Sequence, residues 1–192
     1  TVIDLRTAEE AELQGKWDCT QFGIRYHHIP FPGGGGNKKE DRRVLKESTN
    51  LGSLYLHIIG AKLFKKQLAA ALEIISSPKN HPVVFHCAIG KDRTGILSAI
   101  LLSVLGIDDD TIIQDYTLSG PPVSKVRREM IKDPPKMEYI RQLPDYFWQA
   151  APESMEIFLS TIKKKHGSIL AYLINLGIET YLIKSMRKAL LV

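Results

Sequence analysis

A cysteine and an arginine six residues apart form the most reactive pattern in this chain. Cys87 and Arg93 belong to the stretch HCAIGKDRTG, residues 86–95. The preceding residues, Val83 to Phe85, predict a short buried strand, and the apolar run from Ile96 to Leu105 predicts a buried helix. A loop that enters a helix directs backbone N–H groups at one spot, where the helix dipole adds positive potential. Such a spot favours a phosphate or a thiolate, and an arginine fork can bind two phosphate oxygens. The pattern therefore predicts attack of a thiolate on phosphorus.

The pattern HCxxGxxRTG resembles the signature of the cysteine-dependent protein tyrosine phosphatase superfamily. Average residue usage predicts the six fixed positions together by chance in roughly one such chain per million. The resemblance implies a hydrolase of phosphate monoesters that works through a phosphocysteine, with no cofactor and no metal. The catalytic residues are then Cys87, Asp92, Arg93 and Thr94, and the substrate-binding residues are Ala88, Ile89, Gly90, Lys91 and Gly95.

Three polar residues of the stretch have distinct expected roles. Cys87 is the expected nucleophile, and Arg93 holds the phosphoryl group as charge develops on its oxygens. The Thr94 hydroxyl is expected to donate to the thiolate and to help it leave in the second step. His86 departs from the strand on the face opposite Cys87, so we expect it to orient the loop and not to act as a base.

The general acid has three candidates. Many members of the superfamily supply the leaving-group proton from a separate Trp-Pro-Asp loop, and this sequence has no such tripeptide. In the related bacterial group an aspartate within the cysteine loop is taken as the acid, and that position is Asp92 here. A phosphate dianion beside a carboxylate favours the protonated carboxyl group. Asp41 is the second choice and Asp115 the third.

Lys91 bears on the substrate. It adds a second positive charge to the loop, and loops of this type occur in phosphatases that accept phosphoinositides. Ala88 occupies a position at which the best-known lipid phosphatase loop has a lysine. We therefore expect activity on phosphotyrosine, with phosphoinositides and phosphoserine or phosphothreonine as further substrate classes. Gly90 and Gly95 are expected to let the backbone turn tightly and approach the phosphate.

Three rival functions stay open on this pattern. A sulfurtransferase also uses a cysteine loop, but its usual loop lacks the arrangement of Gly90, Arg93 and Thr94. A non-catalytic phosphate-binding pseudophosphatase is disfavoured because Cys87 and Arg93 occur together. A redox sensor would pair Cys87 with Cys19, but Cys19 lies in a polar run and is better explained as an incidental cysteine.

Composition favours one globular domain over residues 1–192, which the resemblance implies is a phosphatase domain. Hydrophobic residues make up 44% and charged residues 24% of the chain, and two cysteines provide no disulfide framework. A thiol nucleophile favours a reducing, cytoplasmic setting, with secretion as the alternative if a signal precedes Thr1. The strand-like opening without methionine leads us to expect that the natural protein begins earlier. No apolar run reaches the length of about 18 residues that a membrane-spanning helix needs.

The formal charge of +5 makes an acidic partner plausible. The basic residues gather in five short groups, and each group by itself is best explained as a solvated helix face. The groups are Lys38–Lys39, Arg42–Arg43, Lys65–Lys66, Lys125–Arg128 and Lys163–Lys165. Aromatic residues do not alternate with them, so the pattern argues against a nucleic-acid module. Phosphorylated proteins, phosphoinositides and peripheral contact with an anionic membrane explain the excess charge, and no oligomeric state is assigned.

The first thirty residues predict the start of an α/β fold. Strands are expected at Val2–Leu5 and Ile24–Ile29, with a helix at Thr7–Gln14 whose Thr7 and Glu10 have the spacing of a capping box. Asp4 and Arg6 are expected to form a structural ion pair. The motifs VIDLRT and YHHIPF, with a similar ending, resemble the branch of bacterial tyrosine and lipid phosphatases with fungal relatives. The expected architecture is a mostly parallel sheet of four or five strands flanked by helices on both faces.

The rest of the chain is predicted to be largely helical. A long helix is expected over Leu54–Ile75, and Asp108 to Asp110 are explained as a helix cap and first turn without a metal site. Residues 119–150 are interpreted as a lid or recognition insertion, against an ordinary packed helical insertion. The glycine loop, residues 33–36, is either a functional loop or a plain surface linker. Helices are expected from Pro152 to Gly167 and in two further short segments.

Overall fold

The computed structural model describes residues 1–16, 19–33, 39–133, 138 and 140–191. The three strands occur among helices up to residue 86, and the described elements after β3 are helical. In order, they are β1 (Val2–Asp4), α1 (Ala8–Gln14), η1 (Thr20–Phe22), β2 (Tyr26–His28), α2 (Lys39–Glu47), α3 (Gly52–Gly60), α4 (Phe64–Ile75), η2 (Pro78–Asn80), β3 (Val84–His86), α5 (Asp92–Leu105), α6 (Asp109–Thr117), α7 (Gly120–Met130), η3 (Asp145–Trp148), α9 (Pro152–His166), α10 (Ile169–Asn175) and α11 (Thr180–Leu190).

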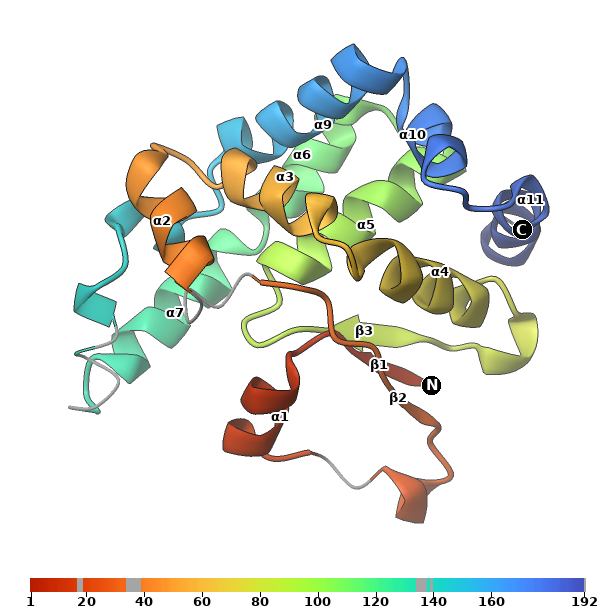
Figure 1. Cartoon of the computed structure of the whole chain (residues 1–192). Helices are drawn as coiled ribbons and strands as arrows, with labels where there is room; N and C mark the ends of the chain where they lie inside the picture. The colour runs from red at the N-terminus through yellow and green to blue at the C-terminus, as the bar shows by residue number, and fades with distance from the viewer. Residues whose placement is uncertain (17–18, 34–38, 134–137, 139, 192) are drawn as a thin grey trace.

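The sheet is parallel and has the strand order β2–β1–β3. The central strand β1 places Val2 opposite Tyr26 on one side and opposite Val84 on the other. In Figure 1, α1 lies on one side of the strands, and α3, α4, α5 and α9 lie on the other. The predicted α/β architecture with a parallel sheet and a helical C-terminal half is therefore confirmed.

The expected number of strands was wrong, because the sheet has three strands within the described residues and not four or five. After β3, the apolar residues recur at helical spacing. In α9 they bury Met155, Phe158, Leu159 and Ile162 on one face. These segments satisfy their backbone groups within helices, so they add no strand to the sheet.

Strand β3 lies at an edge of the sheet, and this corrects its predicted burial. Val84 is 60% exposed, whereas the sequence predicted a buried strand from Val83 to Phe85. An edge strand pairs on one side only, so an apolar side chain there can face solvent. Phe85 and Val83 still pack against the hydrophobic core.

The helix predicted over residues 54–75 is two helices, α3 and α4. The chain leaves helical geometry at Ala61, whose φ of −69° and ψ of 139° are extended. The predicted apolar face of the second helix is confirmed, because Phe64, Leu68 and Ile75 are buried. The break lets α3 and α4 follow different directions, and α3 can therefore approach the loop after β3 (Figure 1).

Several predicted helix ends are confirmed by their local hydrogen bonds. Thr7 and Glu10 form the predicted capping box at the start of α1. The side chain of Asp108 accepts a hydrogen bond from the backbone N–H of Thr111, and Gly106 ends α5 in the left-handed conformation. Within the described residues, no helix is long and apolar enough to cross a membrane.

Residues 119–150 contain α7 and η3, and residues 134–137 and 139 lie outside the described part. The described portion is attached to the body, because Val123, Phe147 and Trp148 are buried. Arg127 in α7 pairs with Asp145 in η3 at 2.6 Å. The lid interpretation stays a prediction. Of the glycine loop, only Gly33 lies within the described residues.

Burial along α4 yields a test of the packing. Leu68→Ala removes a fully buried side chain and should lower the free energy of unfolding by about 2–5 kcal/mol. Leu63→Ala, at a position that is 62% exposed just before the same helix, should change it by less than about 0.5 kcal/mol. Urea unfolding of both variants measures the two values. Equal destabilisation by the two substitutions would contradict the described burial of α4.

Candidate active site

The loop between β3 and α5 contains backbone N–H groups that have no backbone partner among the described residues. Gly90 has a φ of +77°, a left-handed conformation that glycine adopts without steric cost. Ala88, Ile89, Gly90 and Lys91 donate their N–H groups to no backbone carbonyl in the described part of the chain. The 14-residue helix α5 begins directly afterwards, at Asp92. Its N-terminal dipole and the unpaired N–H groups create a spot that attracts an anion.

Arg93 lies in the first turn of α5 and is held by Glu10 of α1. Its Nη1 and Nη2 donate to the two carboxylate oxygens of Glu10 at 2.5 and 2.7 Å. Nη1 also approaches the backbone oxygen of Leu5 at 3.4 Å, and the residue is only 2% exposed. This bidentate pair fixes the plane of the guanidinium. Arg93 Nε is buried without a partner among the described residues, so one donor stays available.

Burial and neighbouring charges act in opposite directions on this pair. Burial opposes the charge of Arg93, but the hydrogen bonds that it donates to Glu10 and the negative charges of Cys87, Glu10 and Asp92 raise the pKa of its guanidinium. Burial likewise opposes the carboxylate of Glu10, but Arg93 and the capping bonds with Thr7 lower the pKa of Glu10 below its ordinary value of 4.5. Both groups are therefore charged at neutral pH.

Asp92 is held by groups from two other helices. Tyr55 of α3 donates its hydroxyl to Asp92 Oδ1 at 2.8 Å, and the Tyr116 hydroxyl of α6 lies 2.5 Å from that of Tyr55. Burial, followed by the charge of Asp92, raises the pKa of Tyr55 well above its ordinary value, so Tyr55 stays a donor. Among the described residues, Asp92 Oδ2 accepts no hydrogen bond. One carboxylate oxygen is thus fixed, and the other is unengaged.

Gly95 allows this network to approach α5 closely. A Cβ at Gly95 would lie 3.1 Å from Cδ2 of Tyr116. A larger residue would therefore push the Tyr116 ring away, and with it the hydroxyl that reaches Tyr55. A small residue is therefore needed at this position because the Tyr116 ring packs against it, in addition to the predicted approach of the backbone to phosphate.

Lys91 is completely buried beneath the loop. Its Nζ lies 2.8 Å from Asp92 Oδ1 and donates to the backbone oxygen of Phe147 at 2.9 Å. It also lies 5.2 Å from the centroid of the Phe147 ring, a distance typical of a cation–π contact. Lys91 therefore connects the loop to η3, within the segment predicted to be a lid or recognition insertion.

The N-terminal strand supports the loop from the other side. Arg6 binds the buried carboxylate of Asp4 through Nε and Nη2, and Tyr26 donates to the same carboxylate at 2.5 Å. The expected structural ion pair is therefore present. His86 Nδ1 donates to the backbone oxygen of Cys87 at 3.0 Å, in agreement with an orienting role. Its Nε2 lies 4.0 Å from Asp4 Oδ1.

The remaining residues of the loop are mostly covered. Cys87 is 7% exposed, and the buried Oγ1 of Thr94 has no hydrogen-bond partner in the described part of the chain. Ala88 and Ile89 are half-buried, and Ile89 packs against the core. No disulfide joins Cys87 to Cys19, and Cys19 is itself buried.

The two alternative candidates for the general acid lie on the helices α2 and α6. Asp41 is buried on α2, where its Oδ1 lies 3.6 Å from His57 Nε2. Asp115 is exposed on α6. No group of three or more potential metal ligands occurs among the residues that the structure describes.

Sequence reasoning missed the partners that hold the loop. Glu10 was recognised only as a helix cap, and Tyr55, Tyr116 and Phe147 were not singled out as site residues. One signal was available for the tyrosines, because a buried tyrosine in an apolar helix needs a partner for its hydroxyl. The identity of that partner was not encoded locally.

Comparison with known proteins places the whole chain in one family. A family described as the tyrosine phosphatase family matches residues 1–192. The chain is 33% identical over 227 aligned positions to the triple specificity protein phosphatase PtpB of Mycobacterium tuberculosis, covering 99% of this chain and 81% of that protein. It is 30% identical over 120 positions to a tyrosine-protein phosphatase of Nostoc commune, covering 62% of this chain and 39% of that protein.

The Arg93–Glu10 pair predicts a dependence of stability on pH. Because folding lowers the pKa of Glu10, its contribution is complete above the ordinary value of 4.5 and is lost as the pH falls through the lower folded value. Glu10→Gln should lower the free energy of unfolding near neutral pH by about 3–5 kcal/mol, since it leaves Arg93 buried without a counter-charge. Between about pH 6 and pH 3 the variant should also lose less stability than the wild type.

The matched control is Glu12→Gln, an exposed position on the same helix. Urea unfolding across the pH range should show that the free energy of unfolding of this control depends on pH as it does in the wild type. The same pH dependence in Glu10→Gln would show that the pair does not contribute to it.

Proposed function

Because the chain belongs to the tyrosine phosphatase family, we propose that it hydrolyses phosphotyrosine through a phosphocysteine formed on Cys87. Membership confirms the predicted resemblance to cysteine-dependent tyrosine phosphatases and the predicted class of enzyme, a phosphoric monoester hydrolase. The catalytic roles of individual residues are part of the proposal. The observation that supports these roles is the geometry of Arg93. Its two Nη atoms donate hydrogen bonds to Glu10, while its buried Nε has no partner among the described residues.

The phosphoryl group is proposed to occupy the spot in front of α5. The N–H groups of residues 88–91 and Arg93 Nε would bind its oxygens, because these donors have no hydrogen-bond partner among the described residues. Glu10 contributes by holding the guanidinium in place before the substrate arrives. Donors that need no reorganisation stabilise developing charge more than flexible ones do.

In the first step, the Cys87 thiolate attacks phosphorus. An S–P bond forms as the P–O bond to the leaving group breaks, and the leaving oxygen takes a proton from Asp92. Asp92 suits this role because Tyr55 fixes one of its oxygens and leaves Oδ2 unengaged. The step starts from the protonated form of Asp92.

In the second step, water hydrolyses the phosphocysteine. Asp92, now a carboxylate, takes a proton from the attacking water, and the S–P bond breaks to release inorganic phosphate and the thiolate. The Thr94 hydroxyl is proposed to donate to the departing sulfur. Its buried Oγ1 lacks a partner in the described residues, so the donor is not committed elsewhere.

Substrate preference is proposed from charge and from relatedness. Phosphotyrosine is the first substrate class, and phosphoserine or phosphothreonine and phosphoinositides are further classes. The name of the Mycobacterium tuberculosis relative records triple specificity for that protein. Lys91 supports a preference for highly anionic substrates through the positive potential that it adds below the loop, although its ammonium group itself is engaged with Asp92 and Phe147.

Residues 119–150 are proposed to contribute to substrate recognition. Their support is the link from Lys91 to Phe147, together with basic residues such as Arg127 on the adjoining helix α7. The proposed setting is a reducing compartment, the cytoplasm, because the reaction requires the thiolate of Cys87. Contact with an anionic membrane surface would be peripheral.

Replacement of the nucleophile tests the function. We expect the wild type to release phosphate from phosphotyrosine peptides without added metal, and Cys87→Ser to be inactive on every substrate. Cys19→Ser should retain wild-type rates if it folds normally. A panel of phosphotyrosine, phosphoserine and phosphothreonine peptides and soluble phosphoinositides, with phosphate release as readout, ranks the substrates. Absence of turnover by the wild type on this panel and on aryl phosphates would instead indicate a non-catalytic phosphate-binding protein.

Replacement of the proposed acid tests its role. Asp92→Asn should reduce kcat for phenyl phosphate by about a hundredfold or more, because a poor leaving group needs the proton. The reduction should be smaller for p-nitrophenyl phosphate, whose leaving group is stable as an anion. Asp115→Asn is the exposed control and should match the wild type on both. Unchanged turnover of phenyl phosphate by Asp92→Asn would remove Asp92 from this role, and a leaving-group effect confined to Asp41→Asn would transfer it.

A further inference from the structure

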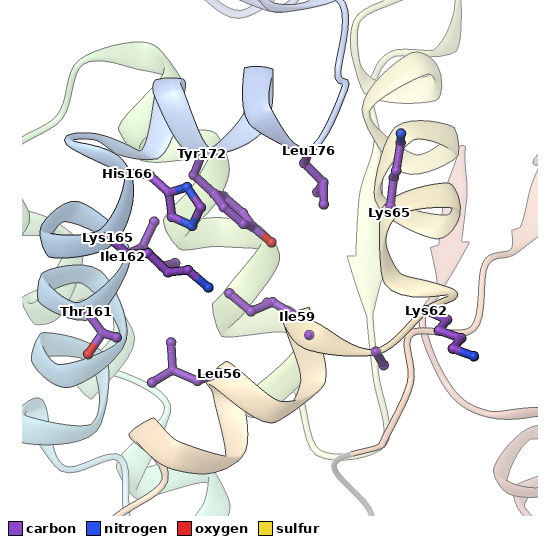
Figure 2. A pocket seen from close by; sticks show the side chains of 12 residues that line it. Leu56, Ile59, Lys62, Lys65, Thr161, Ile162, Lys165, His166, Tyr172 and Leu176 are labelled. Carbon is purple, nitrogen blue, oxygen red and sulfur yellow. The ribbon is translucent and has the colours of Figure 1, made fainter.

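A cavity with a volume of about 520 Å³ lies between the α3–α4 corner and the helices α9 and α10 (Figure 2). None of its lining residues belongs to the loop of residues 86–95, nor are Glu10, Tyr55 or Phe147 among them. The cavity is therefore separate from the proposed catalytic site. Its volume is within the range of about 300–1,000 Å³ that small-molecule sites occupy in proteins.

The rim of this cavity is basic. Lys62 and Lys65 line it from one side and Lys165 from the other, and no carboxylate is among the lining residues. The described residues give none of these three lysines an ion-pair partner. Lys65 packs over Gly177, where a Cβ would lie 2.8 Å from its Nζ. The combined potential at the rim favours an anion.

The interior of the cavity is mostly apolar. Leu56 and Ile59 of α3 face Ile162 of α9 and Leu176 after α10 across it (Figure 2). All four are buried or half-buried. Water in contact with such walls is readily displaced by an apolar group of a ligand.

One polar group stands out against these walls. Tyr172 is only 6% exposed, and its hydroxyl has no hydrogen-bond partner within the described chain. Figure 2 shows this hydroxyl directed into the cavity, away from the edge of the ring that contacts His166. Burial raises the pKa of Tyr172 to about 12, so the group is a donor at neutral pH. An unpaired buried hydroxyl is costly, and a ligand oxygen within the cavity would satisfy it.

From this arrangement we propose that the cavity binds a free amphiphilic anion, a molecule with an apolar chain and one carboxylate-like head. The chain lies against Leu56, Ile59, Ile162 and Leu176, and the head interacts with the lysines of the rim. An oxygen of the ligand accepts the hydrogen bond of Tyr172. The cavity is open to solvent on one side, and its volume fits a single small molecule, which distinguishes this site from a flat surface for a membrane.

Decanoate is the probe, and isothermal titration calorimetry measures its binding to the wild-type protein. Inorganic phosphate is present in excess, so that the catalytic loop is occupied. Acetate, which has the head without the chain, should bind at least about tenfold more weakly, because each buried methylene contributes about 0.8 kcal/mol. Decyltrimethylammonium, which has the chain with the opposite charge, should also bind at least about tenfold more weakly.

Paired variants locate the binding. K65E combined with K165E should weaken decanoate binding by about tenfold, whereas K66E combined with K164E alters neighbouring exposed lysines outside the cavity and should change it less than about twofold. Tyr172→Phe removes only the hydroxyl and should weaken binding by about two- to tenfold. Turnover of an aryl phosphate serves as the check that each variant is folded.

Four outcomes would overturn the proposal. They are the absence of decanoate binding, equal binding of decanoate and decyltrimethylammonium, equal effects of the two lysine pairs, and binding to phosphatidylglycerol vesicles without binding of free decanoate. None of these outcomes affects the proposed phosphatase reaction, which the Cys87→Ser comparison tests by itself.

Discussion

The buried ion pair between Arg93 and Glu10 is the constraint on which the site depends. A guanidinium that is 2% exposed would be strongly destabilising without a carboxylate, and Glu10 supplies one in a bidentate arrangement. The two residues are 83 positions apart, so the pair also attaches α1 to the first turn of α5. The chain thus has to bring its first helix against the start of α5 in order to bury Arg93. The same pair leaves the guanidinium rigid and charged, as the binding of a phosphoryl group requires.

Around this pair, Lys91 and Asp92 compensate each other, and each of the three consecutive charged residues from Lys91 to Arg93 is also held by a group from another element. Lys91 lies against Asp92 and Phe147, Asp92 also accepts from Tyr55, and Arg93 is held by Glu10. The compensating groups come from α1, α3 and η3, which are distant in the sequence. The loop is consequently held by groups from three different elements. Such support would preorganise the loop for the proposed reaction, because its charged side chains are already held by partners before a substrate binds.

Helix α3 serves the proposed catalytic site and the cavity at the α3–α4 corner at the same time. Tyr55 reaches Asp92, while the next residue, Leu56, lines the cavity between α3 and α9. Consecutive residues of a helix point about 100° apart, so one helix can present two faces to two different environments. This arrangement depends on the break at Ala61, which separates α3 from α4 and places Lys62 and Lys65 at the rim of the cavity.

The sequence by itself determined the local chemistry of this protein: the cysteine loop between a strand and a helix, the capping box at Thr7, the caps at Asp108 and Gly106, and the α/β order of elements. Each of these depends on residues within a few positions of one another, whose preferred backbone geometry is encoded nearby. Only the tertiary structure decided that Glu10 holds Arg93, that Tyr55 holds Asp92, that Val84 lies at an exposed edge, and that the described residues form a sheet of three strands. These outcomes depend on which distant surfaces pack together. A buried charge or hydroxyl needs a partner, but its local sequence does not specify which distant residue will be that partner.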